Sequence, residues 1–364
     1  MTFGGMVRYL EDVTSLSWQA ADLPRVVFVL VVVLFNEAVR EYRRLSAMRR
    51  KRFFSLLASC FLILFGNLSW AEITKFARFQ VGDTTAYGIV EGDRVRQLAG
   101  DLFGKWTPTD KTHALQEVTL LVPTQPRHVF AMAGNYKSHV SGAITTTTIT
   151  TTTKITFDPE TNKTQTSTTT KEVVRIPGNV PEKFQIPQPF FKSISSLTAH
   201  GTKIAIPAHS KGEVHFEAEM VIVIGRLARN VSRATADDYV LGVTCGNDVS
   251  ERTWQKSDVQ WWRGKASDTF GPCGPFVVAG LDYNNLRMRL LLNGQVKQDE
   301  STSQLIHDVA SIVSHISEHV TLYPGDLIFT GTPGETSAIK AGDIVEVELE
   351  GVGVLRNQVA AEME

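Results

Sequence analysis

Residues 214–225 read VHFEAEMVIVIG, and this stretch sets the expectations for the fold and for the functional site. The apolar run at 220–224 predicts a strand that is buried in a core. Side chains alternate across a strand, so His215, Glu217 and Glu219 should share one face, with neighbours roughly 6–7 Å apart. Two carboxylates on one face of a buried strand repel each other unless a cation or a proton lies between them.

A hard divalent cation would remove this repulsion, because Mg²⁺, Mn²⁺ and Ca²⁺ prefer carboxylate oxygen. The third candidate ligand is Asp248, at the end of the expected strand YVLGVTCGND. Asp248 would equally suit the N-cap of a following helix, and the two glutamates alone would fit a solvated strand face. Three roles are open for His215: a metal ligand, a side chain that supports a metal ligand, or a histidine that is simply packed in the core. Together the pattern favours a metal site formed by Glu217, Glu219 and Asp248.

The composition bounds the class of protein. The chain has 364 residues, 37 Lys+Arg against 38 Asp+Glu, and a formal charge of −1. With no basic stripe in addition, this balance argues against nucleic acid as a partner. A hydrophobic content of 43% is enough for a sizeable core in one large domain or two ordinary ones. Cys245 and Cys273 are expected to be unpaired, partly buried thiols, with a bridge between them as the alternative.

The first 71 residues do not have the pattern of a folded domain. Residues 48–71 read MRRKRFFSLLASCFLILFGNLSWA, with a basic start, an apolar centre and small residues before Glu72. This pattern predicts a secretory signal peptide and export to the periplasm or the outside. A membrane anchor is the alternative, but the apolar run falls short of the ~20 residues of a spanning helix. A cytoplasmic location is a further alternative. Residues 1–47 resemble no domain and are interpreted as an extension before a true start at Met48.

The remaining chain predicts a mainly β (α+β) fold. Residues 72–125 alternate apolar and polar positions and are expected to form a small N-terminal subdomain of strands and a helix. Residues 126–364 would form the catalytic domain, with helices at 249–256 and 303–319. The threonine-rich insertion at 143–180 is expected to be an exposed hairpin, with a disordered insertion as the alternative.

Several segments resemble the fumarylacetoacetate hydrolase family, in the order in which that family has them. They read HFEAEMVIVIG, CGNDVSERTWQ, WRGKASDTFGPCGPFVV, LNGQVKQDEST, LYPGDLIFTGTPGE and AGDIVEVELEGVGVLRNQV. The resemblance covers roughly 187–358, and AGNYKSH at 133–139 is similar to the family segment that carries a catalytic histidine. Residues 72–122 are similar to the N-terminal region of many bacterial members.

The resemblance implies a β-rich domain that holds one divalent cation through Glu217, Glu219 and Asp248. Mg²⁺ is the first choice, with Mn²⁺ and Ca²⁺ as alternatives, and a homodimer is the usual assembly of the family. The implied substrates are small oxo acids. The resemblance also implies roles for six further residues: His139 and Lys265 in catalysis, and Tyr136, Arg252, Gln255 and Thr332 in substrate binding.

The expected reaction is hydrolysis of a C–C bond in acylpyruvate-like or fumarylacetoacetate-like acids, through an enolate that the metal stabilises. His139 would activate the water. Many family hydrolases place a glutamate three residues after this histidine, where the present chain has Gly142. An isomerase of hydroxymuconate-type acids or an oxaloacetate decarboxylase therefore remains an alternative, because neither needs activated water. A catalytically degraded protein that binds small acids is a third hypothesis.

Overall fold

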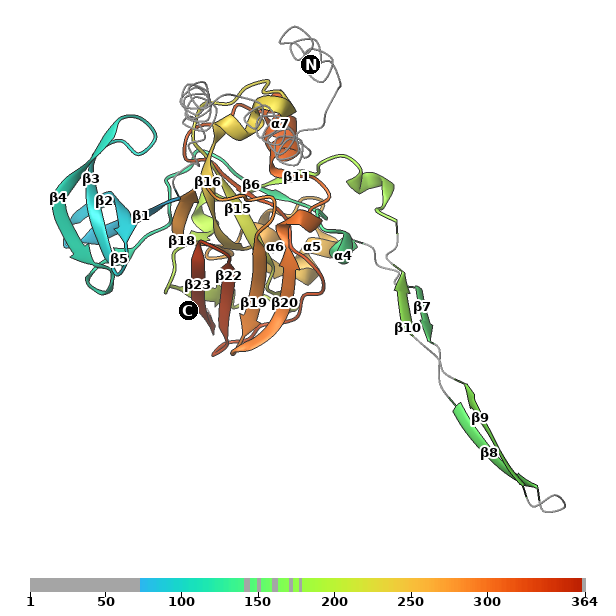
Figure 1. Cartoon of the computed structure of the whole chain (residues 1–364). Helices are drawn as coiled ribbons and strands as arrows, with labels where there is room; N and C mark the ends of the chain where they lie inside the picture. Colours follow the sequence, from blue (N-terminus) through green and yellow to red (C-terminus); the bar gives the residue numbers. More distant parts are fainter. Residues whose placement is uncertain are drawn as a thin grey trace, which may run out of the picture. The chain divides into compact units, whose positions relative to one another are not determined.

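The computed structural model describes residues 73–140, 145–148, 152–158, 163–169, 173–176 and 179–361 (Figure 1). The expected extension 1–47, the signal peptide 48–71 and Gly142 lie outside the described residues. Within the described part, no helix is both long enough and apolar enough to cross a membrane.

A 12-stranded sheet runs through the molecule. Its main path, in spatial order, is β11 (Pro189–Lys192), β6 (Val129–Met132), β21 (Leu327–Phe329), β15 (Ala218–Ile224), β16 (Val240–Asn247), β18 (Gly271–Ala279), β1 (Thr74–Val81), β2 (Thr84–Glu91), β3 (Arg94–Gly100) and β4 (Trp106–Ala114). Two short strands attach beside this path, β12 (Leu197–Thr198) to β18 and β5 (Thr119–Leu120) to β1.

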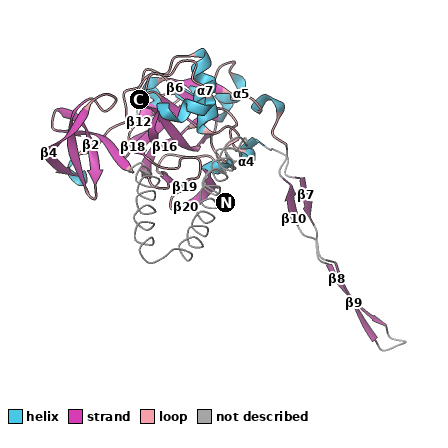
Figure 2. Ribbon diagram, turned by 45° about the horizontal axis from the view of Figure 1, so that its top comes forward, coloured by secondary structure: helices cyan, strands magenta, loops and turns pink. Residues whose placement is uncertain are grey.

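A second sheet of five strands is formed mainly by the C-terminal part of the chain. Its order is β13 (Lys203–Ile206), β23 (Gly353–Ala361), β22 (Ile344–Leu349), β19 (Arg287–Leu292) and β20 (Gln295–Ser301). A separate two-stranded pair joins β14 (Val214–His215) to β17 (Ser250–Glu251). The mainly β fold is therefore confirmed, with strands dominating the described part (Figure 2).

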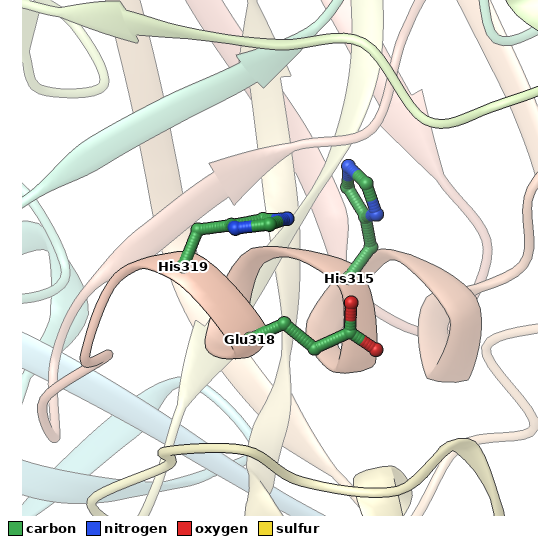
Figure 3. A group of neighbouring side chains, drawn as sticks. All are labelled: His315, Glu318 and His319. Atoms are coloured by element: carbon green, nitrogen blue, oxygen red, sulfur yellow. The ribbon is translucent and has the colours of Figure 1, made fainter.

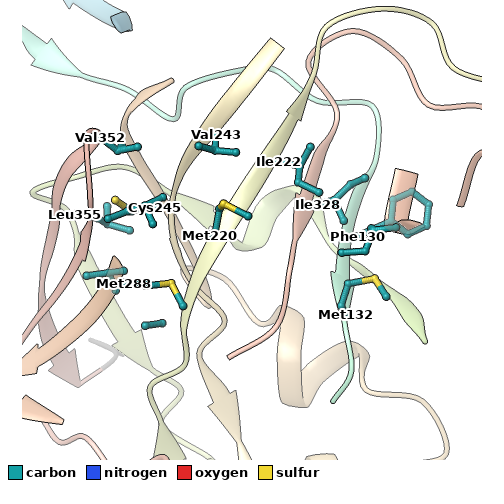
Figure 4. Close-up of a cluster of buried hydrophobic side chains, with 14 of the residues drawn as sticks. Phe130, Met132, Met220, Ile222, Val243, Cys245, Met288, Ile328, Val352 and Leu355 are labelled. Atoms are coloured by element: carbon teal, nitrogen blue, oxygen red, sulfur yellow. The ribbon is translucent and has the colours of Figure 1, made fainter. Parts of the chain in front are cut away.

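The main core fills the space between the two sheets. Strands β15 and β16 contribute one side, and β19, β22 and β23 contribute the other. Figure 4 shows side chains from both sides in contact range of one another, among them Met220, Val243, Cys245, Met288 and Leu355. Cys245 and Cys273 are both free, as expected, and they are fully rather than partly buried.

Strand β15 is buried on both of its faces. Met220 and Ile222 point into the core between the sheets, whereas Val221 and Val223 belong to a second apolar cluster with Phe329. This double burial explains why the sequence of the strand is a continuous apolar run rather than an alternating one. Glu219 lies on the same face as Val221 and Val223, because these positions are separated by two residues.

The helices are short. Among the described residues they are α4 (Lys137–Val140), α5 (Arg252–Ser257), α6 (Trp262–Ala266) and α7 (Val309–His319), with 3-10 turns at Leu115–Glu117, Glu182–Phe184, Ile194–Ser196, Arg233–Tyr239 and Thr302–Gln304. The prediction of one helix over 303–319 is wrong for residues 303–308, which precede α7. Asp308 caps α7 by accepting a hydrogen bond from the Ser311 amide, and this cap sets the start of the helix.

The N-terminal strands β1–β4 extend the large sheet, since β1 pairs with β18 in antiparallel register. The helical element expected among these strands is the single 3-10 turn Leu115–Glu117. The threonine-rich insertion forms antiparallel strand pairs, as expected for a hairpin. These pairs join β7 (Thr145–Thr148) to β10 (Val173–Ile176) and β8 (Thr152–Asp158) to β9 (Lys163–Thr169).

Candidate active site

Three buried carboxylates meet where β15 begins and β16 ends. The antiparallel register pairs Ala218 with Asn247, so Glu217 and Asp248 each lie one residue beyond this pair and face each other. The Asp248 amide donates to the Glu217 carbonyl at 2.9 Å. With Glu219, these side chains bring one carboxylate oxygen each within 4.8 Å of the others, and all three residues are at most 4% exposed.

The structure distinguishes between the roles that the sequence left open for Asp248 and His215. Asp248 is not the cap of the following helix, because Glu251 caps α5 by accepting a hydrogen bond from the Trp254 amide. His215 does not join the carboxylate group and contacts Thr336 and Glu213 instead, with Nδ1 and Nε2 at 3.0 and 3.2 Å from their oxygens.

Cationic side chains surround two of the carboxylates. Lys265 Nζ lies 2.6 Å from Glu217 Oε2 and 2.8 Å from Asp248 Oδ2. Arg252 Nη1 lies 2.7 Å from Glu217 Oε1, so Arg252 holds a ligand carboxylate rather than forming a surface ion pair. Burial raises the pKa of Glu217, but Lys265 and Arg252 outweigh this effect and lower it to about 2.

Lys192 also lies at the candidate site, and it was not predicted from the sequence. Its ammonium lies 2.7 Å from Asp248 Oδ1, and it also donates to the carbonyls of Lys265 and Phe270. Burial lowers the pKa of Lys192 despite the nearby Asp248 carboxylate. The sequence offered one signal for this residue, its position. A lysine that ends the apolar strand β11 does not have to face solvent.

Glu219 differs from the other two carboxylates. Its Oε2 accepts a hydrogen bond of 2.6 Å from the Gly331 amide, but among the described residues no lysine or arginine is in ion-pair contact with it. Burial and the charges of Asp248 and Glu217 raise its pKa well above the usual range. Glu219 therefore requires either a proton or an added cation.

The donor set fits a divalent cation. Carboxylate oxygens from Glu217, Glu219 and Asp248 are the ligands that Mg²⁺ and its hard relatives prefer. An ion there would supply the positive charge that Glu219 lacks. The hydroxyl of Tyr136 is also buried without a hydrogen-bond partner among the described residues. Burial raises the pKa of this phenol, and the Glu219 charge adds to the shift.

A cavity of about 280 Å³ opens beside the carboxylates. Its polar lining includes Glu217, Lys265, His139, Gln255 and Thr332. Its apolar lining includes Met132, Phe184, Phe190 and Trp261, none of which the sequence analysis singled out. The cavity therefore combines a charged end with an aromatic wall, as small-molecule sites commonly do.

His139 is oriented by the backbone. Its Nδ1 lies 2.7 Å from the carbonyl oxygen of Gly334, and Ser138 Oγ accepts a 3.0 Å hydrogen bond from the Gly334 amide. Only a protonated Nδ1 can bond to a carbonyl, so Nε2 of the neutral ring carries the free lone pair. The carbonyl thus fixes the tautomer, a task that a glutamate performs in many hydrolases of the family that the sequence resembles and for which this chain has Gly142.

The remaining expected residues fall into two groups. Gln255 and Thr332 line the cavity, and Gln298 Nε2 donates to the Thr332 hydroxyl at 2.9 Å. Arg252 reaches Glu217, Gln255 and Thr336 and does not line the cavity. Tyr136 is fully buried in the main core and does not line it either.

Comparison with known proteins identifies the family of the chain. Residues 129–360 match the family "Fumarylacetoacetate (FAA) hydrolase C-terminal", and residues 74–123 match "Rv2993c-like, N-terminal". The chain is 35% identical over 295 residues to Protein Rv2993c of Mycobacterium tuberculosis, covering 78% of this chain and 97% of that protein.

Two further comparisons concern proteins with named activities. The chain is 38% identical over 305 residues to the 4-hydroxyphenylacetate degradation bifunctional isomerase/decarboxylase of Salmonella dublin, covering 80% of this chain and 62% of the relative. Among solved structures, 5-carboxymethyl-2-hydroxymuconate delta-isomerase from Mycobacterium smegmatis has a TM-score of 0.65 and 33% identity. That similarity covers 79% of this chain and 100% of the other.

Proposed function

Because the chain belongs to the fumarylacetoacetate hydrolase family, whose members are hydrolases, isomerases and decarboxylases that generally use a divalent metal, we propose that it is a metal-dependent enzyme acting on small oxo acids. The proposed reaction is isomerisation between the 2-hydroxydienoic and 2-oxoenoic forms of such an acid. The observation that carries the proposal is His139, held with a free Nε2 at a cavity that also exposes Glu217 and Lys265.

The charge of the site supports an anionic substrate. Glu217, Glu219 and Asp248 are balanced in formal charge by Lys192, Lys265 and Arg252. A divalent cation held by the three carboxylates would act as a Lewis acid toward the oxygen on which negative charge develops. With it, the site would be two charges positive, which a substrate carboxylate and an ionised 2-hydroxyl together would neutralise.

His139 would move the proton. The isomerisation takes a proton from the 2-hydroxyl and returns one to carbon, so a single imidazole can serve first as base and then as acid. The Gly334 carbonyl orients the ring but carries no full negative charge, and so it strengthens the base less than a carboxylate would. A proton shift within an activated acid makes a smaller demand on the base than activating water does.

The cavity wall would select the rest of the substrate. Phe190 and Trp261 pack edge to face, with ring centroids 5.1 Å apart, and Phe184 adds a third ring to the lining. These rings would contact an apolar chain, while Gln255 and Thr332 offer hydrogen-bonding groups. At about 280 Å³ the cavity suits a small acid rather than a polymer.

Hydrolysis of a C–C bond in an acylpyruvate-like or fumarylacetoacetate-like acid is the second candidate. Lys265 favours it, because an ammonium beside the carboxylates would stabilise the negative charge of a leaving enolate. Burial lowers the pKa of Lys265, but Asp248 and Glu217 outweigh this effect and raise it, so the group stays charged. Decarboxylation of oxaloacetate needs the same charge stabilisation and is the third outcome to be tested.

A substrate panel in D₂O distinguishes these reactions. The purified protein is incubated with Mg²⁺ or Mn²⁺ and with hydroxymuconate-type acids, acetylpyruvate, fumarylacetoacetate and oxaloacetate. We expect deuterium to enter a carbon position of the hydroxymuconate-type acid without chain cleavage, and His139→Asn to abolish this exchange. Release of two acids would identify the hydrolase, and release of CO₂ the decarboxylase. No turnover of any compound would favour a binding protein and contradict the proposal.

We also propose that the protein is exported and dimeric. Export rests on the signal-peptide pattern of residues 48–71, and N-terminal sequencing of the mature protein should then begin at Glu72. Dimerisation rests on exposed apolar side chains such as Phe191, Ile194 and Trp262, which are 59%, 50% and 69% exposed. Light scattering after size-exclusion chromatography measures the mass directly, and a monomer would contradict the second proposal.

A further inference from the structure

Helix α7 carries a second group of metal-ligating side chains. His315, Glu318 and His319 place one ligand atom each within 4.8 Å of the others. In Figure 3 both imidazole rings rise from the same side of the helix, with His319 reaching along it toward His315. The ring centroids are 5.4 Å apart. This group is separate from the buried carboxylates of β15 and β16.

The sequence of the helix explains the arrangement. Residues three and four positions apart are neighbours on a helical surface, so His315, Glu318 and His319 fall on one patch. The opposite face is anchored by buried side chains, namely Val309, Ile312, Val313, Ile316 and Ser317. Glu318 and His319 are consequently exposed, while His315 is half-buried beside them.

The backbone under this patch is firmly held. Arg229 Nη1 donates to the carbonyls of Ser317 and Glu318 at 3.0 and 2.6 Å. The Ser317 hydroxyl is also tied down, since it accepts from the Val231 amide at 3.0 Å. Metal binding would therefore need only side-chain rotation at the patch. Zinc–nitrogen bonds of about 2.0–2.1 Å require the donor atoms to draw closer, and exposed side chains can do so.

We propose that His315, Glu318 and His319 form a surface binding site for Zn²⁺. Two imidazoles and one carboxylate are a donor set that zinc takes up in proteins, leaving a fourth position for water or another ligand. Imidazole nitrogen selects the zinc and copper class of metals, whereas Mg²⁺ and Ca²⁺ take oxygen ligands. The protein would thus hold two different cations at two chemically distinct sites. The ion at α7 would cross-link the last turn of the helix.

The test uses the full-length protein, purified without a histidine tag and kept in excess Mg²⁺. Zinc is titrated by calorimetry into the wild type and into His315→Ala/His319→Ala. In parallel, Cu²⁺ replaces zinc as a spectroscopic probe, because bound imidazole nitrogen splits the copper EPR signal and carboxylate oxygen does not. The wild type is expected to bind one more zinc ion than the double variant and to show nitrogen splitting that the variant loses.

Two controls keep the result interpretable. His113→Ala removes a histidine that packs on Phe79 in the N-terminal strands, and it should leave both the zinc stoichiometry and the copper spectrum unchanged. His319→Ala alone removes an exposed side chain, so it tests the site even if the change at half-buried His315 impairs folding. Equal zinc stoichiometry and equal copper spectra in the wild type and His319→Ala would overturn the proposal.

Discussion

The two proposed metal sites of this protein are built in opposite ways. Glu217, Glu219 and Asp248 come from two strands that pair across the sheet, and they are buried among lysines and an arginine. His315, Glu318 and His319 come from little more than one turn of α7, with Glu318 and His319 exposed and His315 half-buried. The first group depends on the fold for its geometry and its charge balance, whereas the second depends on helical spacing alone.

This contrast predicts how each group responds to change. A substitution among the buried carboxylates alters charges that cannot be screened by water, so its effects on activity and stability should be large. A substitution on the exposed face of α7 should affect zinc binding and little else. The predictions below test this difference, beginning with the largest expected effect.

Glu219→Gln should abolish the metal-dependent reaction while leaving the fold intact. Its raised pKa means that the metal-free protein tends to hold this carboxyl protonated, and glutamine resembles that form. The loss of a ligand should reduce kcat/KM by about 10²–10³-fold or more, the scale on which electrostatic stabilisation of a transition state acts. Steady-state kinetics measures it. Asp299→Asn, at an exposed pair with Arg287, is the control and should retain activity.

Lys192→Met should destabilise the protein by about 3–5 kcal/mol, because it leaves the buried Asp248 with one cationic partner fewer. Urea denaturation gives the free energy of unfolding. Lys203→Met removes an exposed lysine from β13 and should change stability little. A loss of less than about 1 kcal/mol in Lys192→Met would mean that this ion pair adds no more than a surface pair does.

Stabilisation by Mg²⁺ should grow as the pH rises above the ordinary pKa of a glutamate, about 4.3. The folded-state pKa of Glu219 is raised, so its contribution to the stability of the metal-free protein is lost as pH rises through that value. Mg²⁺ binds the deprotonated form and removes this penalty. Melting temperatures with and without Mg²⁺ measure the difference. In Glu219→Gln the pH dependence should flatten, and an unchanged dependence would exclude Glu219 as its source.

Asp308→Ala should have the smallest effect, a loss of about 1 kcal/mol of stability, because it removes the N-cap of α7. The carboxyl also pairs with Arg233. Zinc binding should be unchanged, since the proposed ligands lie at the other end of the helix. Urea denaturation and zinc titration together check this prediction. A weakened zinc site would show that the patch depends on the whole helix.

The sequence predicted the elements whose signals are local. The apolar run of β15 required burial on both faces, and the glutamates at its start required compensation of their charge. The spacing of Leu305, Val309, Ile312 and Ile316 indicated a helix, but only the structure shows that Asp308 starts it. The motif resemblance supplied His139, Lys265 and Thr332, which all line the cavity.

Two features that act across long separations in sequence were not found. Lys192 lies 56 residues from Asp248 along the chain, and nothing in its own neighbourhood indicates that partner. The Gly334 carbonyl that orients His139 is a backbone group, which a motif does not record. The ligands on α7 did have a local signal, the spacing of His315, Glu318 and His319. The helix was predicted from its apolar face, which does not contain these three residues.

Diffraction from a crystal soaked in Mn²⁺ tests the central claim most directly. The anomalous signal of manganese identifies the ion without relying on the shape of the electron density. We expect a manganese peak within bonding distance of one oxygen each of Glu217, Glu219 and Asp248. The ion would then give Glu219 the positively charged partner that it lacks. If the carboxylates instead keep only their lysine and arginine partners and no manganese lies among them, the metal-dependent mechanism is contradicted.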